Sequence, residues 1–529
     1  MTQYPPSFGP DALTPLAYLE RARYIYADSL AVVDGDLRLT YGEFADRCAR
    51  LAGGLVAAGI EPGDRVSVLS SNTHMALEAH YGVPMAGGVL NALNTRLSAP
   101  ELAYIVEHAG SKLLIVDHEL RALGQQTLAL MSAPPRLVVA DGPDDEYASL
   151  LTAEPHERRV DDEWSLISIN YTSGTTGRPK GVMYSHRGAR VSSMATVAHC
   201  KLDARMNFLW TLPMFHCNGW CYTWAVTAAG GTHVCLRKVE PAEIWRAIHE
   251  DGVTHFNAAP TVLIGVGYHA DAAPAPNAIS VATGGAPPSP TLIARLAELN
   301  IDVTHLYGLT ETYGPSVLCE WRPQWDSLDA AGKARMKARQ GVHMISGTRV
   351  RVVDDTGADV AADGNTPGEV VLRGDNVMTG YYRDPEATEK ASIPGPGGAW
   401  FRSGDVGVMH PDGYIELRDR SKDVIISGGE NITSIEVEQA IASHAAVLEC
   451  AVVSAPDDKW GEVPVAFVVL KPGTTASEAD IVEHVKASIA RYKAPKRVYF
   501  EELPKTGTGK IQKFVLRDRM WNDRSARIG

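Results

Sequence analysis

A stretch rich in glycine and hydroxyl residues, from Tyr171 to Val182, concentrates groups that can bind an anion. It follows a short apolar run, Leu166 to Ile169, which is typical of a buried strand. Glycines let the backbone fold closely around a guest, so that amide N–H groups and hydroxyls can face it. The spacing differs from that of the usual P-loop, because Arg178 and Pro179 separate the second glycine from Lys180. The sequence therefore predicts a phosphate-binding loop of another kind.

Two later loops could hold a flat ligand and a hard cation. Gly284 and Gly285 follow the strand-like residues 280–283, and paired glycines let a ligand approach the backbone. In the segment 307–312, Tyr307 can stack on a base and the Glu311 carboxylate can hold Mg²⁺. Taken alone, the first loop could equally be a tight turn, and a lone Thr-Glu pair is more often a helix cap.

Charged residues near the end of the chain complete the set. Asp405 and Arg420 have side chains of opposite charge, and a carboxylate can accept hydrogen bonds from two hydroxyls of a ligand. The alternative is an Asp/Arg pair that holds a turn. Lys510 ends a Gly-Thr-Gly run, where a lysine is more often a solvated loop residue than a catalyst.

The run from Thr172 to Gly181 resembles the signature of the adenylate-forming superfamily, which includes acyl-CoA synthetases, luciferases and the adenylation domains of peptide synthetases. The other three motifs occur in the order that this family has, so the resemblance covers the chain from Leu39 to about Ile511. It implies ATP, Mg²⁺ and coenzyme A as ligands. The ATP site that it implies consists of Thr172, Ser173, Gly174, Thr175, Thr176, Gly177, Lys180, Gly284, Gly285, Ala286, Pro287, Tyr307, Gly308, Thr310, Asp405 and Arg420.

The resemblance also implies catalytic roles. Lys510 matches the C-terminal catalytic lysine, Glu311 is the metal ligand, and Thr176 joins them as a catalytic residue. A carboxylate that attacks the α-phosphorus of ATP builds up charge, and a mobile ammonium can neutralise this charge. The expected reaction forms acyl-AMP and pyrophosphate, and then a thioester with CoA.

The segment from Pro213 to Trp220 is expected to line the acid pocket. Amino-acid-activating relatives carry an aspartate where this chain has His216, so an α-amino acid would lack a partner for its ammonium. The segment resembles the acyl-CoA synthetase branch with medium-chain fatty acid and methylmercaptopropionate ligases. The predicted pocket residues are His216, Trp220, Gly284, Tyr307 and Gly314. An ordinary core histidine and tryptophan are the alternative, and the acid's length or aromaticity stays open.

The segment 427–431 resembles the loop past which CoA ligases thread the pantetheine arm, and it contains Ser427, Gly428, Gly429 and Glu430. Lys422 falls where relatives place the hinge between two domains. Transfer of the adenylate to an amine or an oxygen, activation of an aryl acid and a non-catalytic nucleotide-binding module are the alternatives.

Strand-like and helix-like segments alternate through most of the chain, for example the helix-like residues 241–251 between the strand-like residues 232–236 and 254–258. This alternation predicts an α/β fold of mostly parallel, helix-covered sheets, with ligands at the carboxyl ends of strands. Residues 133–163 look irregular, and residues 325–340 look like one exposed charged helix. A small β unit follows. We expect an N-terminal adenylation domain, residues 1–420, and a mobile α+β domain, residues 421–529, that carries the catalytic lysine.

Bulk properties exclude several classes. With 529 residues the chain needs at least two domains, and its formal charge of −13 disfavours nucleic acid. Seven scattered cysteines without zinc-site spacing indicate free thiols in a reducing cytosol. No apolar run approaches the ~20 residues of a membrane helix, and no signal-peptide pattern is present, so we expect a cytoplasmic protein. Charge and periodicity are silent on the oligomeric state, and a homodimer stays open.

Overall fold

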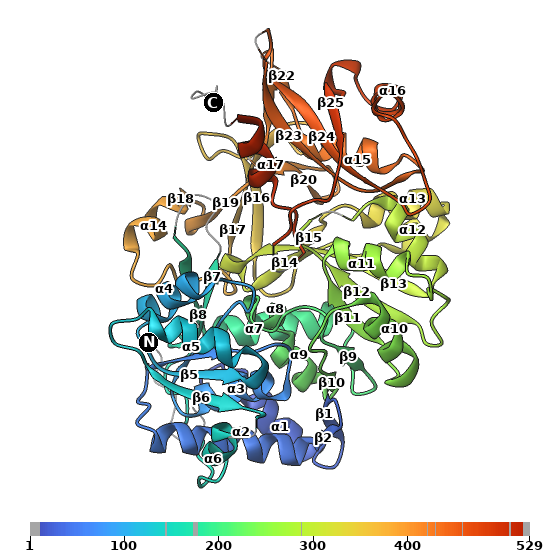
Figure 1. Ribbon diagram of the computed structural model, residues 1–529. Helices are drawn as coiled ribbons and strands as arrows, with labels where there is room; N and C mark the ends of the chain where they lie inside the picture. Colours follow the sequence, from blue (N-terminus) through green and yellow to red (C-terminus); the bar gives the residue numbers. More distant parts are fainter. Residues whose placement is uncertain are drawn as a thin grey trace.

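The computed structural model describes residues 11–142, 145–172, 178–286, 288–420, 422–428, 430–457, 459–506 and 509–521. These residues form four sheets, and Figure 1 shows them stacked along the molecule, with the N-terminal half at one end and the C-terminal unit at the other. Within these ranges, no helix is long and apolar enough to cross a membrane. All seven cysteines are free thiols.

Two large sheets build the N-terminal half. Nine of the thirteen adjacent strand pairs in the two sheets are parallel. The four antiparallel pairs lie toward the ends of the sheets. The nine-stranded sheet runs in the order β15 (Val342–His343), β14 (Gly314–Leu318), β13 (Ile301–Leu309), β12 (Ile279–Thr283), β11 (His255–Ala258), β9 (Asn207–Leu209), β10 (Thr232–Val234), β1 (Leu30–Asp34) and β2 (Leu37–Thr40). The six-stranded sheet runs β6 (Arg136–Ala140), β5 (Ser111–Asp117), β3 (Arg65–Leu69), β4 (Val89–Ala92), β7 (Leu166–Thr172) and β8 (Lys180–Ser185).

Helices connect and cover these strands, as the alternation in the sequence predicts (Figure 1). Helix α2 begins as expected, because the Thr40 side chain accepts from the Glu43 N–H while Glu43 caps the Thr40 N–H. The helices of this half are α1 (Leu16–Ile25), α2 (Tyr41–Ala57), α3 (His74–Met85), α4 (Ala99–Ala109), α5 (Arg121–Ala129), α6 (Glu146–Leu150), α7 (His186–His199), α8 (Cys217–Trp220), α9 (Tyr222–Ala229), α10 (Pro241–Glu250), α11 (Pro260–Gly267), α12 (Pro290–Glu298) and α13 (Ala330–Lys337).

One large apolar core joins the two sheets. Its fully buried side chains include Phe44 on α2, Trp210 after β9 and Trp224 on α9. A second core lies between α10, α11 and α12 and the strands β11 to β13. Burial of large apolar side chains is the main stabilising contribution to such a domain. The strand ends that carry the sequence motifs therefore rest on a rigid base.

Two smaller units of mostly antiparallel strands follow. The first contains β16 (Arg349–Val353), β17 (Pro367–Arg373), β18 (Ser392–Gly395), β19 (Gly398–Met409) and β20 (Ile415–Arg420), with α14 (Pro385–Lys390) beside them. The second contains β21 (Ile425–Ser427), β22 (Glu430–Ile432), β23 (Val447–Asp457), β24 (Gly461–Leu470) and β25 (Arg497–Phe500), with α15 (Ser434–Ala442), α16 (Glu478–Ser488) and α17 (Lys513–Trp521). The second unit has its own apolar cores.

Two expectations about local structure were wrong. Residues 133–163 are not irregular throughout, because β6 lies at the edge of the six-stranded sheet with its last three residues buried, and α6 follows it, whereas residues 151–163 form neither helix nor strand. Residues 325–340 do not form one exposed helix. A short 3₁₀ turn, Pro323–Ser327, comes before α13, Trp325 is buried, and Arg339 forms a bidentate ion pair with Asp412. The charged composition of this segment therefore did not reveal that Trp325 and Arg339 anchor it to the rest of the fold.

Candidate active site

The predicted phosphate loop joins two antiparallel strands. β7 ends at Thr172 and β8 begins at Lys180, and these two residues are paired in register. The predicted contacts Ser173, Gly174, Thr175, Thr176 and Gly177, and likewise Pro287 and Gly429, lie outside the described residues. The loops after β12 and β13 follow neighbouring parallel strands of the other sheet. Strand ends therefore deliver the motifs to one region, as the fold class leads one to expect.

Glu311 lies in a short 3₁₀ turn, Thr310–Thr312, that follows β13. The Tyr381 hydroxyl donates a hydrogen bond to Glu311 Oε1 at 2.7 Å, and the Glu311 carbonyl accepts from the Met378 N–H at 2.8 Å. Burial, together with the adjacent Glu311 charge, raises the pKa of Tyr381, so the phenol stays protonated and acts as a donor. Tyr381 also lies beside Lys180, whose Nζ is 4.9 Å from the centre of the tyrosine ring.

Asp405 and Arg420 face each other across the β19–β20 pair. The buried Asp405 carboxylate contacts Arg420 Nε at 3.2 Å and accepts from the Tyr307 hydroxyl at 2.8 Å. The Tyr307 ring is itself buried, in the core of the first antiparallel unit. An ionised carboxylate has about four acceptor positions, so Asp405 keeps capacity for further donors. Tyr307 and Arg420 thereby orient this carboxylate.

The structure brings Lys510 to the same region. Burial, reinforced by the Arg420 charge, lowers the pKa of Lys510 to about 8, whereas the Asp405 charge acts in the opposite direction. The Lys510 loop is closed by two hydrogen bonds with Thr506, at 3.1 and 2.7 Å. The Thr261 hydroxyl, on α11, donates to the Gly509 carbonyl at 2.9 Å. The C-terminal lysine is thus docked onto the N-terminal half.

The acid-pocket segment contains a turn of left-handed helix. Five consecutive residues, from Cys217 to Cys221, have φ between 51° and 62°, and four of them are not glycine. Left-handed backbone costs such residues roughly 1–2 kcal/mol each. Buried hydrogen bonds oppose this cost: Asn218 Oδ1 accepts from Ser168 Oγ and from Asn170 Nδ2, both at 2.8 Å. Strain that is held in this way is typical of functional sites.

His216 directly precedes this turn, and Trp220 is one of its residues. Trp220 lies against two of the predicted glycines, because a Cβ on Gly284 would be 3.2 Å from Trp220 Cη2, and one on Gly314 would be 3.0 Å from Trp220 Cδ1. Burial, with a smaller effect of the Lys510 charge, lowers the pKa of His216 to about 4. The imidazole is therefore neutral at pH 7 and close enough to Lys510 to sense its charge. Gly284, Trp220 and Gly314 thus meet at one wall.

Other predicted residues have different surroundings. Tyr313, the neighbour of Gly314, has a fully buried side chain that stacks on Tyr184 at 3.9 Å and accepts from the Ser185 N–H at 2.6 Å. Gly308 admits no side chain, because its Cβ would be 2.0 Å from the Gly314 carbonyl oxygen. Gly285 and Ala286 are exposed, as a surface for a ligand would be.

The predicted hinge and CoA loop follow β20. Burial lowers the pKa of Lys422, which is half-buried in a turn. Ser427 and Glu430 pair across the β21–β22 hairpin, and Gly428 has φ 60° with the Trp460 ring against its Cα. A side chain at position 428 would come within 2.7 Å of that ring, so the hairpin needs glycine there.

A metal site made by protein groups alone is absent from the described part of the chain, where no cluster of three His, Cys, Asp or Glu residues forms. The Glu311 donor set nevertheless fits Mg²⁺. This ion keeps several waters and usually binds one or two carboxylates together with substrate phosphates. With Glu311 Oε1 occupied by Tyr381, Oε2 has no hydrogen-bond partner among the interactions that the structure records.

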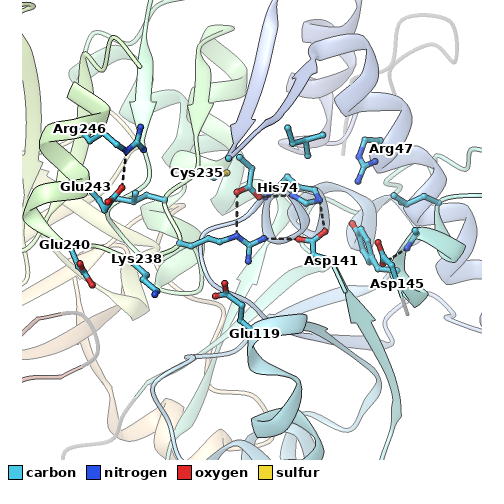
Figure 2. Close-up of a pocket in the computed structure, with 18 residues that line it drawn as sticks. Arg47, His74, Glu119, Asp141, Asp145, Cys235, Lys238, Glu240, Glu243 and Arg246 are labelled. Atoms are coloured by element: carbon cyan, nitrogen blue, oxygen red, sulfur yellow. Dashed lines mark hydrogen bonds and ion pairs between the residues drawn. The ribbon is translucent and has the colours of Figure 1, made fainter. Parts of the chain in front are cut away.

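A cavity of about 850 Å³ lies elsewhere, lined by residues of β1, α3, α6 and α10 and the loops after β5, β6 and β10 (Figure 2). Its ionic cluster joins the two large sheets. His74 contacts Asp34 at 2.8 Å and Asp141 at 3.5 Å, and Arg237 contacts Asp117 at 2.7 Å. None of the sequence motifs contributes a residue to this cavity, and we assign it a structural role.

Sequence reasoning missed two residues of the candidate site, Tyr381 and Thr261, and did not single out Asn218 within the predicted pocket segment. Tyr381 contacts Glu311, and Thr261 contacts Gly509. Asn218 contacts Asn170 in the strand β7. For Asn218 a signal existed, since asparagine tolerates left-handed backbone and the neighbouring Gly219 does so too. Tyr381 and Thr261 are ordinary residues in the sequence, and only the fold brings them to their partners.

The comparisons with known proteins agree with this geometry. The model of the AMP-binding enzyme family matches residues 19–382, and that of the AMP-binding enzyme C-terminal domain matches residues 436–510. The chain belongs to the AMP-binding enzyme family. This AMP-binding enzyme is 46% identical to a 2-methylpropanoate–CoA ligase of Humulus lupulus, over 98% of this chain and 97% of the relative.

Other relatives extend the picture. The AMP-binding enzyme is 42% identical to a peroxisomal acetate/butyrate–CoA ligase of Arabidopsis thaliana, over 96% of this chain and 94% of the relative. Its fold matches that of ATP-bound MatB from Rhodopseudomonas palustris with a TM-score of 0.83 at 28% identity, covering 96% of this chain and 99% of the other. The predicted superfamily and fold class are confirmed.

Proposed function

We propose that this chain is an acid–thiol ligase that joins a short- or medium-chain carboxylic acid to coenzyme A at the expense of ATP. In the first step a carboxylate oxygen attacks the α-phosphorus, which forms acyl-AMP and releases pyrophosphate. In the second step the CoA sulfur attacks the acyl carbon, which forms the thioester and releases AMP and the thiol proton. The observation that carries the proposal is the position of Lys510, within electrostatic reach of both Asp405 and His216.

In the adenylation step, the chain binds ATP through its strand-end loops. Asp405 accepts from the ribose hydroxyls, and Arg420 and Tyr307 hold its carboxylate in place. The Lys510 ammonium lies over the reacting centre and opposes the negative charge that develops there. The β,γ-phosphates go to the loop between Thr172 and Lys180, whose middle residues, Thr176 included, take part by resemblance alone. Gly284, Gly285 and Ala286 are proposed to lie against the adenine, a role that Pro287 shares by resemblance alone.

Glu311 would hold Mg²⁺ together with phosphate oxygens and water. When bound, the ion would neutralise charge on the phosphates of ATP. Thr310 lies next to Glu311 in the same 3₁₀ turn and is proposed to contact a phosphate. The Tyr381 hydroxyl holds one Glu311 oxygen, which leaves the other toward the ion.

Trp220 and the Gly314 wall limit the depth of the acid pocket, which supports a short aliphatic acid. The names of the relatives point the same way, because they act on 2-methylpropanoate, acetate or butyrate. His216 is neutral, so it cannot pair with the ammonium group of an α-amino acid as a carboxylate would. The second candidate, transfer of the adenylate to an amine, predicts AMP release that does not depend on CoA. Activation of an aryl acid predicts benzoate as the preferred substrate.

We propose that residues 1–420 form the adenylation domain and residues 421–529 a mobile domain that turns about Lys422. After adenylation this turn withdraws Lys510 and presents the hairpin with Ser427, Gly428, Gly429 and Glu430 to the pantetheine arm. Lys422→Pro should slow thioester formation from supplied acyl-AMP, since proline fixes φ. An unchanged rate would argue against the hinge.

The direct test of the function is a panel of acids in an assay of AMP release with and without CoA. Acetate, 2-methylpropanoate, butyrate, hexanoate, octanoate and benzoate cover the candidates. A CoA-dependent signal with the shorter acids supports the proposal, and equal AMP release without CoA contradicts it. We further propose a cytoplasmic enzyme of fatty acid metabolism that can form a homodimer. Cell fractionation and light scattering test location and assembly.

A further inference from the structure

The segment Gly380–Tyr382 runs beside the first residues of β8. Tyr381 pairs with Val182 in an antiparallel bridge, the Tyr382 N–H donates to the Gly181 carbonyl at 2.7 Å, and the Met183 N–H donates to the Gly380 carbonyl at 3.0 Å. These bonds fix the backbone of Tyr381 against the strand that begins with Lys180. The side chain of Tyr381 is buried, at 8% exposure. Its position is therefore determined by the fold rather than by solvent.

The Tyr381 side chain makes two polar contacts. Its hydroxyl donates to Glu311 Oε1 at 2.7 Å, and its ring faces Lys180 Nζ at 4.9 Å from the ring centre, a cation–π distance. Glu311 is also held by its own backbone, since its carbonyl accepts from the Met378 N–H, three residues before Tyr381. The same short segment thus fixes Glu311 through both its main chain and its side chain.

Lys180 is exposed and Glu311 is partly exposed, and each has a long side chain with many rotamers. Their attraction to one another would bring them together as an ion pair and neutralise both. The Tyr381 ring, with an ammonium at its face and a carboxylate at its hydroxyl, gives each a separate partner. Separation matters because the two groups bind opposite charges: Lys180 a phosphate oxygen, and Glu311 a divalent cation.

We propose that Tyr381 is a positioning residue that holds Glu311 and Lys180 apart and ready for the cation and the phosphates of ATP. The inference rests on the proposed function and adds a residue to it. Tyr381 itself contacts neither the acid nor the reacting atoms. If Tyr381 only packed between β8 and the Glu311 turn, loss of its hydroxyl alone would leave cation binding unchanged.

The decisive variant is Tyr381→Phe, which keeps the ring over Lys180 and removes only the hydroxyl. Tyr381→Leu removes both contacts. Tyr382→Phe is the matched control, because the Tyr382 ring contacts His108, Arg65 and Arg383 but no carboxylate. Binding of Mn²⁺ in the presence of a non-hydrolysable ATP analogue, measured by electron paramagnetic resonance, reports on the cation independently of turnover. The Mg²⁺ dependence of acyl-AMP formation and the melting temperature complete the set.

We expect Tyr381→Phe to weaken Mn²⁺ binding and to raise the half-saturating Mg²⁺ concentration by roughly tenfold, as befits the loss of a hydrogen bond to a charged group. Its KM for the acid and its melting temperature should match those of the unmodified enzyme and of Tyr382→Phe. Tyr381→Leu should in addition raise the KM for ATP. Unchanged Mn²⁺ binding in Tyr381→Phe would overturn the inference while leaving the proposed function intact. Absence of ATP-dependent Mn²⁺ binding in the unmodified enzyme would overturn both this inference and the metal role of Glu311.

Discussion

The indole of Trp220 lies against the backbone of Gly314, so closely that a Cβ on Gly314 would be 3.0 Å from Trp220 Cδ1 and 3.1 Å from its Cα. Gly314 also has φ 89°, a conformation that side chains rarely adopt. The tryptophan can therefore lie this close to the backbone only because residue 314 is glycine, and the two residues form one wall of the acid pocket that we propose. This contact gives a physical reason for a short substrate.

Shortening Trp220 should lengthen the acid that the enzyme accepts. In Trp220→Leu, the ratio of kcat/KM for octanoate to that for butyrate should rise about tenfold or more, since each methylene in an apolar pocket contributes ~1–3 kcal/mol. Trp325→Leu is the control, because Trp325 is also a buried tryptophan but packs against Tyr414. The same ratio in Trp220→Leu as in the unmodified enzyme would show that another side chain sets the pocket depth.

Removal of the Lys510 ammonium should separate the two half-reactions. We expect Lys510→Ala to slow acyl-AMP formation by roughly 10²–10³-fold, the effect of losing one charge-stabilising donor. Thioester formation from supplied acyl-AMP should be preserved. Lys505→Ala, which removes a neighbouring lysine that pairs with Glu449, should affect neither step. Equal loss of both steps in Lys510→Ala would refute this division.

The rate of acyl-AMP formation should depend on the protonation of Lys510. Its pKa is lowered to about 8, by burial first and by the Arg420 charge second, so the ammonium is present below pH 8 and is lost as the pH rises through that value. The rate should then fall about tenfold per pH unit above the pKa. The pKa of His216 is about 4, so its imidazole stays neutral and does not change the rate of acyl-AMP formation between pH 6 and 10.

Lys510→Arg provides the comparison for this profile, because a guanidinium does not titrate below pH 12. Its rate of acyl-AMP formation, although lower, should be flat from pH 7 to pH 10. A basic limb near pH 8 that persists in Lys510→Arg would assign the titration to another group.

Neutralising Asp405 should weaken ATP binding. Asp405→Asn removes the partner of Arg420 and a charged acceptor for the ribose, so the KM for ATP should rise roughly tenfold or more. The KM for the acid should change little. Asp412→Asn is the control, since Asp412 pairs with Arg339 away from this site. Equal effects of the two substitutions on the KM for ATP would indicate a general structural loss.

The ionic cluster around His74 should make stability depend on pH. Burial alone would lower the pKa of His74, but its hydrogen bond to Asp34 and the charges of Glu78 and Asp141 raise it above the ordinary value. A raised folded-state pKa stabilises the fold fully below the unfolded pKa of about 6.5, and this contribution is lost as pH rises through the folded value.

The melting temperature of His74→Asn should therefore lie well below that of the unmodified enzyme at pH 6, and the gap should shrink toward pH 9. His269→Asn offers a matched control, because His269 is close to a single exposed carboxylate, that of Asp271. A gap in melting temperature that is constant across this pH range would exclude the protonated imidazole as its cause.

Sequence reasoning reached the fold class and the positions of most strands because periodicity and motif spacing are local signals. The Thr40–Glu43 cap and the strand before Thr172 are of this kind. It failed for residues 136–140, because prolines just before them suggest a loop, whereas their pairing with β5 is set by the tertiary structure. It named the motif residues but not their partners in the fold. Tyr381 is 70 positions from Glu311 and Thr261 is 248 from Gly509, and no local pattern connects such distances.

The left-handed turn from Cys217 to Cys221 also restricts how the proposed acid pocket can diverge. Glycine and asparagine tolerate such backbone, whereas valine, isoleucine and threonine are excluded by their branched Cβ atoms. In a saturation library over these five positions, the surviving variants should be poor in branched residues at each position, whatever acid is used for selection. New substrate preferences would then arise from changes outside the turn, in the residues that face the indole. The pocket can alter its chemistry while the path of its main chain is conserved.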